Sequence, residues 1–362
     1  MKPYGLMADV HAHNWTFAAS VTSEGVNNRL KFLLDDIERC ADETAAAGGD
    51  SLVVAGDLFH VRGSVAPSVL NPTKAALERI RAKHPAMAII ILAGNHDMEH
   101  RHSSEVGNSV QALAGPGVQI INHPTLLPAR GMLLLPWDES VNELKAKIEE
   151  WVYDIGHDGV SLADYDLILH APIDGVIPGL PDHGLTHEWL ASHGFRRVLS
   201  GHYHNHKRFP GNVYSIGALA HHTWNDVGTD AGFLIVGADV EDVTFRASHA
   251  PRFYDVRDED LADETTLALA VADCYVRVRL PKTRSTELEE IRKQLEGMGA
   301  RAVVFNIVKE RVMEREAGAV ATVRAGASVE VSVSDYVKSK PEFADAGADI
   351  IKACLSVLSE VA

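Results

Sequence analysis

The chain has 362 residues, of which 46% are hydrophobic and 23% are charged, a composition typical of a folded protein with a sizeable core. No apolar run approaches the roughly 18 residues that cross a bilayer, and the start, MKPYGLMADVHAH, lacks the pattern of a secretory signal, so we expect a cytoplasmic protein. The formal net charge of −16 argues against a generally basic, nucleic-acid-coating surface.

Short apolar strands alternate with helical patterns over the first two-thirds of the chain. Strands are predicted over Tyr4–Val10, Ser51–Ala55, Met87–Leu92, Met132–Leu135, Leu167–Leu169, Val198–Leu199 and Val213–Ile216, and a closing hairpin over Gly232–Val236 and Val243–Arg246. Amphipathic helices are predicted over Gly25–Ala47 and Pro72–Ala82. Fully apolar strands separated by helices indicate an α/β protein whose sheet is buried on both faces.

The composition changes near Pro251. The acidic stretch Tyr254–Glu264 is interpreted as a linker or exposed connection. Beyond it, strands over Cys274–Leu280 and Ala302–Val308 flank a helix over Ser285–Glu296, and residues 273–312 hold nine Lys or Arg against six Asp or Glu. We therefore predict a second, smaller unit that is locally basic, with domain boundaries at 1–250, 251–315 and 316–362.

The last segment is predicted to be a linker followed by a short helical tail. Gly318–Ser332 is rich in Gly, Ala, Ser and Val, and Ser334–Lys340 and Phe343–Leu358 have helical patterns. A helix this short does not bury its apolar face alone, so we expect it to dock on its own domain or on a partner.

Polar residues follow five of the predicted strands directly. The sequences are Asp9-Val10-His11, Gly56-Asp57-Leu58-Phe59-His60, Gly94-Asn95-His96-Asp97, His170, and Gly201-His202-Tyr203-His204. Because ligands of α/β proteins bind beyond the carboxyl ends of strands, we expect these side chains to gather at one edge. Mixed Asp, His and Asn donors suit two divalent ions of the manganese, zinc or iron type, bridged by Asp57, which together promote phosphoryl transfer.

In this order, the five motifs resemble the calcineurin-like metallophosphoesterase superfamily. Gly-Asp-Leu-Phe-His, together with GNHD and GHYH, is similar to the nuclease subunit of the bacterial SbcCD complex and its counterparts, including phage recombination nucleases. The resemblance implies a four-layer αββα sandwich, a small α+β cap formed by the unit around Cys274–Val308, and a C-terminal helical tail that docks on an SMC-type (Rad50-like) ATPase. It departs at the extra His13 and at Asn205-His206-Lys207.

The resemblance also implies a role for each motif residue. Asp9, His11, Asp57 and His204 would hold one metal, and Asp57, Asn95, His170 and His202 the other, with Mn²⁺ as the expected ion. His96 would be the catalytic histidine, oriented by Asp97, and His60 would place the scissile phosphate. We assign His13, His206, Arg277 and Arg279 to substrate binding; the two arginines stand two apart on a strand and so share a face.

Three functions are compatible with these residues. The first is a manganese-dependent DNA exonuclease or endonuclease of repair, recombination or replication, with an ATPase partner and a possible homodimer. The second is a phosphodiesterase or phosphatase of a small nucleotide, which the acidic net charge favours. The third, a catalytically silent scaffold, requires a missing ligand, and none is missing. The His60 motif, the basic unit and the apolar tail favour the nuclease.

Overall fold

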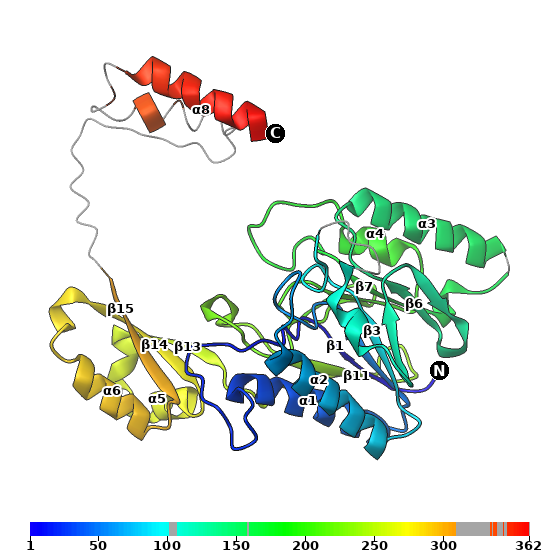
Figure 1. Cartoon of the computed structure of the whole chain (residues 1–362), viewed down its shortest axis with the longest axis horizontal. Coiled ribbons are helices and arrows are strands. Elements are labelled where there is room, and N and C mark those ends of the chain that lie inside the picture. Colours follow the sequence, from blue (N-terminus) through cyan, green and yellow to red (C-terminus); the bar gives the residue numbers. More distant parts are fainter. Residues whose placement is uncertain are drawn as a thin grey trace. The chain divides into compact units, whose positions relative to one another are not determined.

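The computed structural model describes residues 1–100, 107–157, 159–308, 334, 336–338, 343 and 346–361 (Figure 1). The chain divides into two compact units, Met1–Val308 and Lys309–Ala362, which are described separately. The predicted linker Gly318–Ser332 and the predicted boundary at residues 315 and 316 lie outside the described residues. The domain boundaries therefore stay predictions.

The first of two six-stranded sheets has the order β12-β11-β1-β2-β3-β4. Its strands are β1 (Tyr4–Met7), β2 (Ser51–Ala55), β3 (Ala88–Leu92), β4 (Val118–Ile121), β11 (Gly232–Val236) and β12 (Val243–Ala247). The first four are parallel to one another, which brings their carboxyl ends to one edge. The hairpin predicted at β11 and β12 is confirmed by antiparallel pairing of Phe233 with Arg246.

The second sheet has the order β5-β6-β7-β8-β10-β9. Its strands are β5 (Thr125–Leu127), β6 (Met132–Leu135), β7 (Asp166–His170), β8 (Arg197–Gly201), β9 (Lys207–Phe209) and β10 (Val213–Ser215). Its four inner strands are parallel, so this sheet also has a single edge of carboxyl ends.

Alternate residues of each strand face different layers, as period-2 geometry requires. Val53 of β2 belongs to a core shared by both sheets, whereas its neighbours Leu52 and Val54 pack with helices α1 (Asn28–Ala46) and α2 (Pro67–Lys83). Helices α3 (Val141–His157) and α4 (His187–Ser192) cover the outer face of the second sheet. The four layers visible in Figure 1 confirm the predicted αββα class.

A buried ion pair crosses the inner layer. The guanidinium of Arg197 donates to both oxygens of Asp166, at 2.9 and 2.8 Å, and the Tyr4 hydroxyl donates to Asp166 Oδ2 at 2.8 Å. All three residues are fully buried. Such a pair is costly to break, because removal of one partner leaves an uncompensated buried charge. It therefore links β1 of one sheet to β7 and β8 of the other.

Helix α2 begins earlier than predicted. It starts at Pro67, and Pro72 lies inside it rather than at its start. Pro67 occupies the first turn, where a missing N–H is harmless, and Pro72 removes only one hydrogen bond further along. The prediction Pro72–Ala82 was therefore wrong at its N-terminal end because the second proline, not the first, was taken as the start.

The third sheet belongs to the smaller part of the first unit. Its strands β13 (Phe253–Arg257), β14 (Tyr275–Pro281) and β15 (Ala302–Val308) are parallel, with helices α5 (Glu264–Val271) and α6 (Leu288–Gly297). These elements share a separate apolar core that includes Val256, Leu267 and Leu295. The predicted βαβ unit is confirmed, with one further strand.

The acidic stretch Tyr254–Glu264 is not a linker. Most of β13 and a 3-10 helix over Asp258–Ala262 lie within it. Phe253 and Val256 are buried, while Asp255 pairs in register with Arg277 of β14. The strand thus tolerates Asp255, its one carboxylate, because arginines of the neighbouring strand neutralise it.

In the second unit, helix α8 spans Gly347–Val361. It agrees with the predicted helical tail, although it begins four residues later than Phe343. None of the helices in the described part of the chain combines the length and the apolar character that a membrane crossing requires.

Candidate metal centre

The strand ends of both sheets deliver their polar residues to one place. Asp9 follows β1, Asp57 follows β2 and Asn95 follows β3 in the first sheet. His170 ends β7, and His202 follows β8 in the second. The two parallel edges therefore face a common site, which is the arrangement that the motif order predicted.

Four of the predicted ligands lie in a left-handed backbone conformation. Their φ angles are 49° at Asp9, 47° at His11, 53° at Asp57 and 101° at His202. Residues other than glycine rarely adopt positive φ, and where they do the strain is held by surrounding structure, commonly at functional sites. The strained turns at the strand ends thus orient these side chains toward the site.

The glycine before Asn95 makes room for the site. A Cβ atom at Gly94 would overlap the carboxylate and the backbone nitrogen of Asp57. The requirement for glycine here is steric, because two segments of backbone approach closely beside the central carboxylate.

The first group of potential ligands consists of Asp9, His11, Asp57 and His204. The Nε2 atoms of His11 and His204 are 3.2 Å apart, and His11 Nε2 is 3.8 Å from Asp57 Oδ2. Asp9 Oδ2 accepts a hydrogen bond from the His202 N–H, but Asp9 Oδ1 is buried and has no partner among the described residues. A buried carboxylate oxygen without a donor is costly, and a cation at this position removes that cost.

The second group consists of Asp57, Asn95, His170 and His202. His170 Nε2 lies 3.4 Å from Asp57 Oδ2 and 3.1 Å from Asn95 Oδ1, and His202 Nδ1 lies 3.1 Å from the same amide oxygen. Donor atoms about 3 Å apart fit a shared ion at bond lengths of about 2.0–2.2 Å. Because Asp57 Oδ2 belongs to both groups, it is positioned to bridge two ions.

The hydrogen bonds behind the histidines leave the correct nitrogen free. His170 Nδ1 donates to the Ala55 carbonyl at 2.8 Å, so the lone pair of the neutral ring lies at Nε2. His204 Nδ1 lies 2.7 Å from Oδ1 of Asp226, which again leaves Nε2 for an ion. Second-layer partners of this kind orient metal-binding histidines and raise their basicity. The donor set, its spacing and its tautomers therefore fit two divalent ions.

Without ions, the buried acidic and histidine side chains of the site shift one another's pKa values. Burial alone lowers the pKa of His170, but the charge and hydrogen bond of Asp57 outweigh it and raise that pKa to about 9. Burial raises the pKa of Asp57, yet His170 and His11 hold it well below its usual range. Burial raises the pKa of Asp9 to about 6. Without ions, the protonated forms of His170 and Asp9 are therefore stabilised.

The predicted catalytic histidines stand beside the first group. The rings of His60 and His96 are stacked, with centroids 5.5 Å apart and an interplanar angle of 14°. His96 Nδ1 donates to the His60 carbonyl at 2.7 Å, and His60 Nδ1 lies 3.3 Å from His11 Nδ1. Burial lowers the pKa of His60 to about 4, so its ring is neutral at pH 7. If His11 holds an ion through Nε2, its Nδ1 carries the proton and donates to His60 Nδ1, and the proton of the His60 ring then lies on Nε2.

Asp97 does not contact the His96 ring in the way predicted for an orienting partner. Its carboxylate accepts from the backbone N–H groups of Leu58, Phe59 and Gly94, at 3.3, 2.9 and 2.9 Å. Burial raises the pKa of Asp97 to about 7. Asp97 therefore ties the two loops that carry Asp57 and Asn95 together, and the orienting partner of His96 is the His60 carbonyl.

Four further residues were assigned to substrate binding. The His13 ring lies 5.1 Å from that of His60, close to the metal centre. His206 donates from Nδ1 to the Ile216 carbonyl at 3.0 Å and stacks on Phe245. Both guanidinium groups of Arg277 and Arg279 are paired with Asp255. One carboxylate is thus shared by two guanidinium groups, which leaves a net charge of +1 on this face, and the role predicted for the two arginines stays a prediction.

Several residues around the centre were not identified from the sequence. Asp226 contacts His204; its other oxygen accepts from the backbone N–H groups of His222 and Thr223, each at 2.8 Å. Trp137 stacks on His202 with centroids 4.8 Å apart. The spacing Thr223-x-x-Asp226 is a capping-box signal, but it carries no information about His204.

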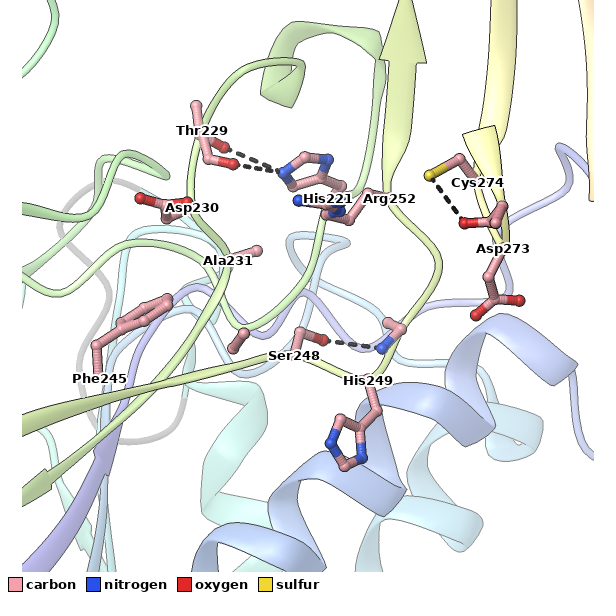
Figure 2. A pocket seen from close by; sticks show the side chains of 13 residues that line it. His221, Thr229, Asp230, Ala231, Phe245, Ser248, His249, Arg252, Asp273 and Cys274 are labelled. Atoms are coloured by element: carbon pink, nitrogen blue, oxygen red, sulfur yellow. Dashed lines mark hydrogen bonds between the residues drawn. The ribbon is translucent and has the colours of Figure 1, made fainter. Parts of the chain in front are cut away.

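A cavity of about 600 Å³ lies away from these ligands (Figure 2). Figure 2 shows His221 and Thr229 on one side, Asp273 and Cys274 on another, and His249 near the linker to β13. His221 Nε2 donates to the Thr229 carbonyl at 2.9 Å, and its Nδ1 accepts from the Phe253 N–H at 3.1 Å. None of the predicted site residues lines this cavity, so size alone does not locate the chemistry.

Comparison with known proteins adds one strong match. A family model described as calcineurin-like phosphoesterase matches residues 2–206. No curated protein matches the chain. A dimetal phosphatase from Danio rerio is 13% identical, with a TM-score of 0.36 over 68% of this chain and 96% of that chain. The nuclease MPE from Pseudomonas putida is 19% identical, with a TM-score of 0.26 over 58% and 66%. Similarities this low carry no information about substrate.

Proposed function

Because the chain belongs to the calcineurin-like phosphoesterase family, it is a phosphoester hydrolase, and we propose that its substrate is DNA. Members of this family use two divalent ions, and the residues around Asp57 fit two. The observation that carries the DNA assignment is the second histidine, His60, stacked on His96 beside the ligands. Hydrolysis of a phosphodiester uses a group that holds the phosphate and one that protonates the leaving oxygen, and this pair can supply both; the choice of DNA rests on the resemblance of the His60 motif to the SbcCD-type nucleases.

In the proposed reaction, the ions, His60 and His96 have separate roles. Two ions bound here would supply positive charge that activates water and stabilises the phosphoryl oxygens. Neutral His60 donates from Nε2 to a phosphoryl oxygen and fixes the diester in line. His96, held by its Nδ1 bond to the His60 carbonyl, acts in its doubly protonated form: it donates the proton at Nε2 to the leaving oxygen and is left as the neutral ring with its proton on Nδ1.

We propose Mn²⁺ as the resident ion. Each ligand group mixes imidazole nitrogens with carboxylate or amide oxygens. Magnesium prefers shells of oxygen alone, whereas manganese, iron and zinc accept such mixtures. Between these three, the choice of manganese rests on the resemblance to the SbcCD-type nucleases.

The wider assignment also rests on that resemblance. We propose a role in DNA repair, recombination or replication, in the cytoplasm, as a homodimer with an SMC-type ATPase that binds helix α8. The supporting observations are the apolar pattern of Gly347–Val361 and the additional sheet β13–β15 after the phosphoesterase part.

A small-nucleotide phosphodiesterase is the second candidate. It is favoured by the net charge of −16 and by the pairing of Arg277 and Arg279 with Asp255, which reduces the positive charge that these arginines present to a DNA backbone.

End-labelled linear DNA and bis-p-nitrophenyl phosphate separate the two candidates. The purified chain is incubated with each substrate in manganese, magnesium or chelator. We expect DNA to be cleaved with manganese and spared with chelator, and the product ladder then gives the polarity. Hydrolysis of the small diester with DNA intact, both in the presence and in the absence of an SMC-type ATPase, would overturn the DNA assignment and leave the phosphodiesterase.

A further inference from the structure

A second cavity, of about 140 Å³, adjoins the metal centre. It lies between the segment that follows His11 and the segment that follows Asp57. Its walls include Ala12, His13, Asn14, Phe59, Val61 and Val65. None of the residues that line it is an arginine, a lysine or a carboxylate.

The cavity is rigidly connected to the ligands. Ala12, next to His11, forms a parallel β-bridge with Phe59, next to His60, and the Ala12 N–H donates to the Leu58 carbonyl at 2.8 Å. Ala12 and Phe59 are buried. The His13 ring, on the cavity wall, is 5.1 Å from the His60 ring. Whatever occupies the cavity is therefore held next to the group that we assign to phosphate placement.

The chemistry of the walls excludes a phosphate and favours an uncharged ring. A phosphate in this cavity would lose its hydration without gaining a cation, which is costly. Valine, alanine and phenylalanine side chains instead gain from covering a flat heterocycle. Ligand pockets of this kind are apolar with a few placed polar groups, and the volume suits a single ring system rather than a duplex.

Asn14 supplies such a polar group. Its Nδ2 donates to Ser68 Oγ at 2.8 Å, which fixes the orientation of the amide. No residue in the described part of the chain donates to its Oδ1, and this oxygen is therefore free to accept from an N–H on the edge of a base.

We propose that this cavity binds the base of a nucleotide adjoining the scissile phosphate, with Asn14 accepting a hydrogen bond from the base edge. The proposal rests on the proposed function, since it needs a nucleotide diester at the metal centre. It adds a specificity subsite to a centre whose ligands alone recognise only the phosphate.

The test compares two esters that differ only in the base. One is the p-nitrophenyl ester of thymidine 5′-phosphate or 3′-phosphate, and the other is its abasic counterpart. With manganese, we expect wild-type kcat/KM to favour the thymidine ester by about tenfold on at least one side, the scale of burying one base. Val61, which is 39% exposed, is changed to tryptophan to fill the cavity. Val61→Trp should bring the ratio close to one, and Asn14→Ala should lower it severalfold.

Two control variants test whether a tryptophan or an alanine placed outside the cavity also changes the kcat/KM ratio of the two esters. Val21→Trp changes a more exposed valine, 75% exposed, that lines none of the cavities described, and Asn142→Ala changes an exposed asparagine of α3. Both should keep the wild-type ratio. If Val61→Trp lowers the melting temperature, Ser64→Trp on the exposed rim of the same cavity replaces it.

The outcomes are distinct. A wild-type enzyme that hydrolyses both esters equally, or a preference that survives Val61→Trp and Ser64→Trp, overturns the base subsite and leaves the phosphodiesterase intact. Hydrolysis of neither ester, with two ions bound, overturns the proposed function itself.

Discussion

Asp226 lies behind His204, a predicted metal ligand, with its Oδ1 atom 2.7 Å from His204 Nδ1. Its second oxygen is held by two backbone N–H groups, and its side chain is buried. Burial by itself raises the pKa of Asp226, but the hydrogen bond from His204 outweighs it and holds that pKa well below its usual range. The carboxylate is thus a permanent negative charge that directs the lone pair of His204 toward the ion.

Asp226→Asn should weaken manganese binding by about 10- to 100-fold, because the amide keeps the shape but removes the charge that raises ligand basicity. Equilibrium dialysis with manganese measures the affinity of each site. Asp36→Asn, at a buried carboxylate that contacts Arg39 and Ser248, is the matched control and should leave the affinity unchanged. Equal affinities in Asp226→Asn and wild type would contradict the role.

His96→Asn should reduce turnover by about 100-fold or more while two ions remain bound, because we assign this histidine to proton donation and not to the ligands of either ion. Turnover of bis-p-nitrophenyl phosphate and metal content per chain are measured together. His84→Asn serves as control, since the ring of His84 contacts Asp42 near the far end of α2. Loss of an ion from His96→Asn would make it a ligand and refute the assignment.

His60→Ala should weaken cleavage of DNA about tenfold more than hydrolysis of bis-p-nitrophenyl phosphate, since a small diester depends less on fixed placement. The comparison is made at saturating manganese. Because His60 Nδ1 lies 3.3 Å from His11 Nδ1, a second reading exists. Equal losses on both substrates, together with weaker metal binding, would show that His60 acts by orienting His11.

Manganese affinity should increase as the pH rises from 7 to 9. In the ion-free protein His170 has a pKa of about 9, so an ion must displace its proton, and affinity gains about tenfold per pH unit for each proton displaced. The same raised pKa stabilises the ion-free fold below 6.5, and this stability is lost as the pH rises through 9. Calorimetric titrations at pH 7, 8 and 9 measure the affinity; values independent of pH would show that His170 is already neutral.

Removal of residues 334–362 should leave phosphodiester hydrolysis and the melting temperature of the remaining chain unchanged, because the ligands and both large sheets lie within Met1–Val308. The truncated chain should no longer associate with an SMC-type ATPase in sedimentation experiments. A large loss of stability would mean instead that the tail packs on its own chain.

Much of the fold was predictable because each strand is a local apolar run. Ser51–Ala55, Met132–Leu135, Gly232–Val236 and Ala302–Val308 have the predicted bounds. Two predictions were wrong, one where carboxylates interrupt an apolar pattern and one where a proline lies inside a helix. Strand β13 was not predicted because Arg277, which pairs with Asp255, lies 22 residues further along the chain. Helix α2 was predicted to begin too late because a proline such as Pro72 is typical of a first helical turn.

The sequence by itself determined which donor types meet at the centre, since the ends of parallel strands must share one edge of a sheet. How those donors are held depends on contacts between segments far apart in the chain. Asp226 is 22 residues from His204, Trp137 is 65 residues from His202, and the partner of His96 is a backbone carbonyl 36 residues away. Such contacts leave no local pattern, because they depend on how separate segments pack rather than on the periodicity of any one of them.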